Sequence, residues 1–168
     1  QDTFIKDNII HNMNHYVLDY NKELASNYFI QSKEVIRFYE KYFGDYQWYE
    51  DGYKLIEVPY LGMEHQSAVT YGNGFSIYNG VRSKSWPMYG VIDPLIIHET
   101  GHEWFGNSVT ASDPTHIWIH EGMQVYSEAI YFEDKFNSYE VGVHYLNSIK
   151  NRIVNEIPIV GNENENHW

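Results

Sequence analysis

The residues that point to chemistry are His98-Glu99-Thr100-Gly101-His102, followed by Glu121 after 18 intervening residues. Two histidines four residues apart project from one face of a helix, so both imidazoles can reach a single metal ion. Glu121, carried on a later segment, would supply a third ligand. Three protein ligands leave the fourth position of a zinc ion for water, as in catalytic zinc sites. The pattern predicts a zinc hydrolase site.

The charges of this ligand set favour hydrolysis. Two neutral imidazoles and one carboxylate leave zinc with net positive charge, which lowers the pKa of bound water from about 15.7 toward 7. Glu99, beside the first ligand, is then the natural general base and later the acid that protonates the leaving amine. The alternative is an amphipathic helix whose histidines are satisfied polar side chains. The zinc interpretation is favoured, because an H-E-x-x-H motif would arise by chance only roughly 0.04 times in a chain of this composition.

Neighbouring groups are expected to orient the ligand imidazoles. Glu128 lies seven residues after Glu121, two turns along the same helical face, and could reach a ligand histidine. Its alternative role is a solvated helix carboxylate. His120, directly before Glu121, is the one further histidine that could touch the site.

The zinc helix is expected to begin at Asp93-Pro94, with Asp as the N-cap and Pro in the first helical position. It is expected to run through Phe105 and to end at Gly106. Apolar spacing predicts further elements: helices at about 31–43, 120–135 and 139–154, and strands at 53–60 and 66–71, with a turn at 72–74. Residues 1–30 read as a weakly structured lead-in, helical near 15–28, and residues 160–168 as a frayed tail.

These elements place strands early and helices late, which predicts an α+β fold in one domain spanning residues 1–168. The net charge of −12 argues against a nucleic-acid partner and favours cationic ligands such as a free amino terminus. The chain has no cysteine and no run of residues that resembles a membrane span or a signal peptide. These features leave the compartment open.

Two longer segments give the site a family resemblance. The stretches HETGHEWFGNSVT and WIHEG resemble the zinc signature of the aminopeptidase N-like gluzincins, typically H-E-x-x-H-x-W-F-G-N followed by W-L-N-E-G. The spacing to the third ligand is one residue shorter than in thermolysin-type enzymes. Upstream, Leu61-Gly62-Met63-Glu64-His65 resembles the family's G-x-M-E-N element. The resemblance covers roughly residues 31–150.

The resemblance implies a thermolysin-like zincin catalytic domain, in which a small mixed sheet lies over a helical lobe with the zinc helix. It implies one Zn²⁺ per chain and a peptide substrate with a free N-terminus. In the family, the residue matching Glu64 holds the α-amine, and the segment with Gly62 and Met63 is an edge strand along which the peptide lies. Asn107 of the W-F-G-N stretch joins Glu128 and His120 as a candidate for the outer shell of the zinc site.

The chain also departs from the family pattern. Leu61 replaces a Gly, His65 an Asn, and His120 the Asn before the third ligand, but no zinc ligand and no base is lost. The family's oxyanion-stabilising Tyr lies farther downstream than the 168 − 121 = 47 residues that follow Glu121. An amino-terminal β-domain and a helical carboxy-terminal domain are also expected outside this chain. The chain is therefore expected to be a truncated catalytic domain, weakly active at best by itself.

The sequence thus predicts a zinc metallopeptidase, specifically an aminopeptidase. Two alternatives stay open at this point. One is an endopeptidase or another hydrolase on the same zinc scaffold, and the other is a non-catalytic fragment that binds zinc.

Overall fold

The computed structural model of the chain describes residues 2–6, 9–72, 74–75, 92–154, 156 and 158–161. It consists of two compact units, an N-terminal unit (1–103) and a C-terminal unit (104–168). Most of the predicted turn at 72–74 lies within these residues, whereas most of the expected frayed tail (162–168) lies outside them. The single-domain organisation stays a prediction.

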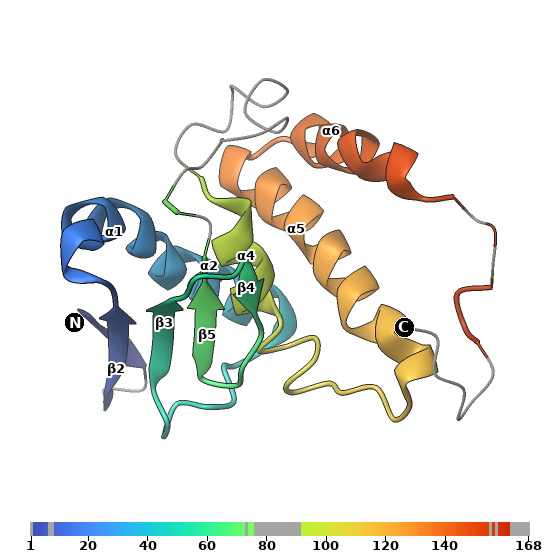
Figure 1. Cartoon of the computed structure of the whole chain (residues 1–168). Helices are drawn as coiled ribbons and strands as arrows, with labels where there is room; N and C mark the ends of the chain where they lie inside the picture. The colour runs from blue at the N-terminus through green and yellow to red at the C-terminus, as the bar shows by residue number, and fades with distance from the viewer. Residues whose placement is uncertain are drawn as a thin grey trace. The chain divides into compact units, whose positions relative to one another are not determined.

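The N-terminal unit contains a five-stranded mixed sheet (Figure 1). Its spatial order is β1-β2-β3-β5-β4, with bounds β1 (Asp2–Lys6), β2 (Ile9–Tyr16), β3 (Tyr53–Glu57), β4 (Gly62–Met63) and β5 (Ala68–Tyr71). The pairs β1–β2 and β4–β5 are antiparallel, while β2–β3 and β3–β5 are parallel. The small mixed sheet and the strands near 53–60 and 66–71 are therefore confirmed, in shorter form.

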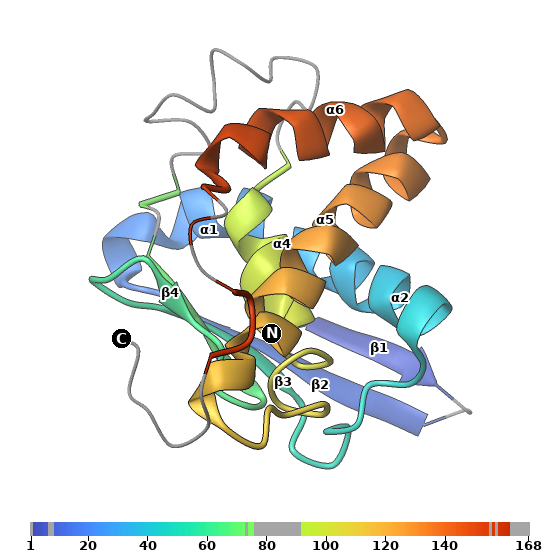
Figure 2. The ribbon, with the colours of Figure 1, turned by 90° about the vertical axis from the view of Figure 1, so that its right-hand side faces the viewer.

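Helices cover one face of this sheet: α1 (Lys22–Phe29), α2 (Gln31–Phe43) and α4 (Pro94–Gly101) stand on the same side (Figure 2). A short 3-10 turn, η1 (Asp19–Asn21), precedes α1. The bounds predicted for α2 are confirmed. Met13, Leu55 and Val69 are fully buried on neighbouring strands and build the core with aromatic side chains such as Phe29. Leu55 stands opposite Val69, and Met13 stands opposite Tyr53, two residues before Leu55, so all three lie on one face of the sheet.

The weakly structured lead-in is wrong for residues 2–6 and 9–16, which form two strands, whereas the helix expected near 15–28 is confirmed in part by α1. Their pairing depends on a distant segment: β2 runs parallel to β3, with Met13 opposite Tyr53. Ile9 and Ile10 stay largely exposed, so these strands lack the apolar alternation that identifies a strand locally.

The start of α4 is confirmed and is tied to the rest of the unit. The Oδ1 atom of buried Asp93 accepts a hydrogen bond from the Leu95 N–H (3.0 Å), as an N-cap does. Its Oδ2 atom accepts one from the Tyr71 hydroxyl of β5 (2.6 Å), and its N–H donates to Gln31 Oε1 of α2 (2.8 Å). Burial, together with this carboxylate, raises the pKa of Tyr71, so the phenol stays a donor.

The zinc helix was expected to reach Phe105, but α4 ends at Gly101. The Glu103 N–H donates to the Thr100 carbonyl (3.1 Å), three residues back instead of the four of an α-helix, as in a 3-10 turn. The Trp104 carbonyl accepts from the Val109 N–H (2.9 Å), which closes a loop instead of a further helical turn. These alternative partners end the helix before Gly106.

The C-terminal unit is helical. It contains η3 (Pro114–Ile119), α5 (Glu121–Phe136), α6 (Tyr139–Ile149) and η4 (Lys150–Arg152), which agree with the helices predicted near 120–135 and 139–154 except that α6 ends earlier. Phe132 of α5 stacks on Tyr145 of α6 with ring centroids 5.0 Å apart. A Cβ on Gly142 would lie 2.9 Å from the Ala129 carbonyl oxygen, so glycine permits this close approach of the two helices.

Among the helices that the structure describes, none is both long and apolar enough to cross a membrane.

Tyr71→Phe should destabilise the protein by about 1–3 kcal/mol, because it removes the donor to a buried carboxylate while keeping the ring. Chemical denaturation monitored by circular dichroism measures this difference. Tyr20→Phe is the matched control, since Tyr20 is 80% exposed, and it should leave stability unchanged. Equal midpoints for Tyr71→Phe and the wild type would show that the bond does not stabilise α4.

Candidate metal centre

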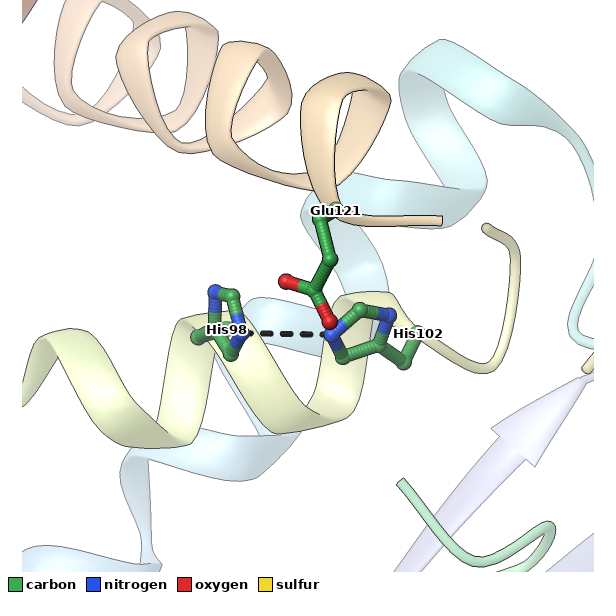
Figure 3. Close-up of side chains that lie close together, drawn as sticks. All are labelled: His98, His102 and Glu121. Atoms are coloured by element: carbon green, nitrogen blue, oxygen red, sulfur yellow. Dashed lines mark hydrogen bonds between the residues drawn. The ribbon is translucent and has the colours of Figure 1, made fainter. Parts of the chain in front are cut away.

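His98 lies in α4 and His102 is the C-cap residue one turn later, and their rings face each other (Figure 3). Their Nε2 atoms are 3.2 Å apart. Two nitrogens bound tetrahedrally to one zinc at about 2.0–2.1 Å would stand about 3.3 Å apart. His102 is buried and His98 half-buried, so one ring is firmly held and the pair stays accessible from one side. The donor pair fits zinc.

Glu99 is packed against the edge strand of the sheet. It is buried, and a Cβ built on Gly62 of β4 would lie 2.5 Å from its Oε1 and 2.8 Å from its Cδ. The backbone of β4 therefore touches the carboxylate directly, and a side chain at position 62 would displace it. The glycine keeps the predicted base beside the strand.

Glu64 follows β4 and joins the same cluster. Carboxylate oxygens of Glu64 and Glu99 and a ring nitrogen of His102 all lie within 4.8 Å of one another. Because β4 is the last strand in the sheet order, this segment is an edge, as the resemblance implied. The structure thus brings the predicted amine anchor next to the predicted base.

The face of α4 that carries Thr100 is fixed to the sheet. The Tyr53 hydroxyl of β3 and the Thr100 hydroxyl share a buried hydrogen bond of 2.7 Å. Burial raises the pKa of Tyr53, which keeps its phenol neutral. Ile96 and Ile97 are buried on the same helix. The helix that carries the two histidines is therefore held rigidly.

Sequence reasoning missed Glu103, the residue after His102. It is 1% exposed, and its Oε1 atom accepts a hydrogen bond from the Ser67 N–H (2.6 Å). In the signature this position is variable, so the motif gave it no role. The one sequence signal was a carboxylate directly before the aromatic pair Trp104 and Phe105.

Glu121 is the first residue of α5, and its side chain is exposed (labelled in Figure 3). Glu128, on the same helix, is 3% exposed, so its alternative role as a solvated carboxylate is wrong. His120 Nε2 accepts from the Ala111 N–H (2.9 Å), which fastens the preceding loop to the start of α5.

The stretch Trp104–Asn107 begins a tight loop. Gly106 has φ +138°, a region that favours glycine, and its N–H donates to the Val109 carbonyl (3.0 Å). The Thr110 hydroxyl donates to the Gly106 carbonyl (2.6 Å). Asn107 is half-buried in this loop. The glycine of the signature is thus explained by backbone geometry.

Comparisons with known proteins identify a family and several relatives. A family model described as the peptidase family M1 domain matches residues 28–159. Endoplasmic reticulum aminopeptidase 2 of Homo sapiens is 30% identical over 152 residues, which cover 83% of this chain and 15% of that protein. Probable aminopeptidase 1 of Sulfurisphaera tokodaii is 26% identical over 118 residues, 68% of this chain and 15% of that protein. The chain thus spans about 15% of the length of these relatives.

Solved structures show the same fold. The M1 zinc metallopeptidase from Deinococcus radiodurans aligns with TM-score 0.59 at 21% identity, covering 78% of this chain and 26% of that one. A mutant of that enzyme bound to a Tyr-Ser-Ala substrate aligns with TM-score 0.58 at 21% identity, covering 78% of this chain and 27% of that one.

Proposed function

The chain belongs to peptidase family M1, and from this premise we propose that it provides the zinc site of an aminopeptidase with a thermolysin-like catalytic domain. One observation carries the proposal: Glu64 and Glu99 converge on His102, whose Nε2 lies 3.2 Å from that of His98. A metal pair, a base and an anionic anchor thus share one place on the N-terminal unit. Hydrolysis of a peptide at its free amino end needs these three functions.

His98, His102 and Glu121 would hold one zinc ion. The first two have the spacing of ligands on one ion, and Glu121 stands at the family's third-ligand position with an exposed carboxylate. When bound, zinc would polarise the scissile carbonyl and lower the pKa of water toward about 7.

Glu99 acts as the general base and then as the acid. Its buried carboxylate takes a proton from the attacking water and returns it to the leaving amine. Contact with the Gly62 backbone limits its movement, so the base stays in place through both transfers.

Glu64 binds the α-ammonium group of the peptide, because a half-buried carboxylate beside the base attracts a cation. Gly62 and Met63 offer the backbone of an edge strand, to which an extended peptide can add as a further strand. The acidic net charge of the chain also favours cationic substrates. We therefore assign the site to peptides with a free N-terminus.

Outer groups support the ligands. We propose that buried Glu128 orients a ligand histidine. His120 would support the site by binding the loop at Ala111, and Asn107 by its place in that loop.

Replacing the base should separate metal binding from chemistry. Glu99→Gln should retain zinc but lower kcat by about 10²–10⁴-fold, since Gln cannot take the proton. Elemental analysis and hydrolysis of an amino-acid anilide by the full-length protein measure the two properties. Glu50→Gln, on an exposed loop, is the control. Turnover near the wild-type rate in Glu99→Gln would refute the role of Glu99.

Replacing the third ligand should release the metal. Glu121→Ala should weaken zinc affinity more than about 10-fold, as even outer-shell losses cost this much. Competition with a chelating dye measures the affinity. Glu140→Ala is a matched control, because Glu140 is also an exposed glutamate in the first turn of a helix. Unchanged zinc affinity in Glu121→Ala would exclude the ligand role.

Blocking the substrate amine should separate the aminopeptidase from the endopeptidase alternative. The full-length protein should hydrolyse a free peptide and leave its N-acetylated form intact, and Glu64→Gln should raise KM for the free peptide about 10-fold or more. Liquid chromatography of the products measures both. Equal cleavage of the two peptides would indicate an endopeptidase instead.

A further inference from the structure

We infer that Glu103 is a positioning residue that fixes the substrate anchor Glu64 relative to the zinc helix. The inference rests on the proposed function, because Glu64 matters only if it holds the substrate amine. Glu103 itself touches no reacting atom. It acts through the turn that follows Glu64.

The contact joins the end of the zinc helix to the turn between β4 and β5. Glu103 directly follows His102, and its Oε1 atom accepts from the Ser67 N–H at 2.6 Å. Both residues are buried, at 1% and 8% exposure. A hydrogen bond to a carboxylate is stronger than a neutral one, and burial shields it from competing water.

The backbone of this turn needs such a partner. Ser67 has φ +55°, the left-handed region that a residue other than glycine adopts at a cost. The turn is closed by a hydrogen bond from the Ala68 N–H to the His65 carbonyl (2.9 Å). The Ser67 carbonyl accepts from the backbone N–H of Lys54 in β3 (3.0 Å). The Ser67 N–H has its partner in Glu103. The carboxylate therefore holds a conformation that the local sequence disfavours.

Glu64 lies three residues before Ser67, so the direction in which it leaves β4 depends on this turn. Its carboxylate stands within 4.8 Å of the reactive atoms of Glu99 and His102. Small displacements of a substrate-positioning group reduce reactivity strongly. One buried carboxylate thus couples the helix that carries the ligands to the residue that anchors the substrate.

The surroundings of Glu103 suit a fixed carboxylate. The Tyr46 side chain is buried beside it, and burial together with the Glu103 charge raises the pKa of Tyr46. The phenol therefore stays protonated and adds no second negative charge. Glu103 is enclosed by protein, so it acts on the substrate through Ser67 and not by direct contact with a peptide.

Two variants test the inference in the full-length protein. Glu103→Leu fills the space without an acceptor, whereas Glu103→Gln keeps an oxygen that can accept from Ser67. Glu50→Leu, on an exposed loop, is the control. Amide hydrogen exchange reports on residues 65–68, elemental analysis on zinc, and kcat and KM on a free-amine anilide.

Glu103→Leu should speed exchange at Ser67 and raise KM about 10-fold, with kcat changed much less and zinc retained. Glu103→Gln should restore both the protection and KM. In the wild type, the Ser67 amide should exchange far more slowly than the amides of exposed His65 and Gln66. This measurement tests the contact between Glu103 and Ser67 even if Glu103→Leu does not fold, and the KM of Glu103→Gln then tests its effect on Glu64.

Rapid exchange of the wild-type Ser67 amide would overturn the inference, as would a Glu103→Leu protein with wild-type KM. So would failure of Glu103→Gln to restore KM. If the wild type bound no free amine, the proposed function would fail instead. Exchange at Ser67 would still report on the Glu103 contact, so the two failures are distinguishable.

Discussion

The buried carboxylate of Asp93 determines where the zinc helix begins and what that helix rests on. One oxygen caps α4 and the other accepts from Tyr71 of β5, while the backbone N–H reaches Gln31 of α2. A buried charge is stable only when its hydrogen bonds are satisfied, so the three elements must come together for any of them to tolerate it. This cap also determines where His98 and His102 lie, because it fixes the first turn of the helix and both histidines follow at set distances along it.

Two further contacts complete the attachment of α4 to the sheet. Thr100, the last but one residue of α4, meets Tyr53 of β3, and Glu103, two residues after the helix, meets the Ser67 N–H. The helix is thus held at its beginning, near its end and just after its end. Preorganised groups of this kind hold catalytic side chains within the narrow limits that reactions demand. The close approach of Gly62 to Glu99 leaves no room for a side chain between β4 and the proposed base.

The C-terminal unit uses related devices on a smaller scale. Asp113 caps η3 by accepting from the Thr115 N–H (2.9 Å), as Asp93 does for α4. His120 accepts from Ala111, so the loop that begins at Trp104 and the start of α5 are one piece of structure. These contacts hold the first turn of α5, which contains Glu121, in a defined conformation.

Local rules were sufficient for much of this protein. The i, i+4 spacing of His98 and His102, the Asp93-Pro94 helix start and the helix at 31–43 follow from short-range geometry, which any reader of the sequence can apply. Strands β1 and β2 were missed because β2 is stabilised by pairing with β3, some forty residues away. The contact of Glu103 with Ser67 was missed for the same reason, because Ser67 lies 36 residues earlier in the sequence and only the folded chain brings the two together. The end of α4 depends on local bonds to Thr100 and Trp104, but the loop that makes them leaves no short-range signal before Gly106.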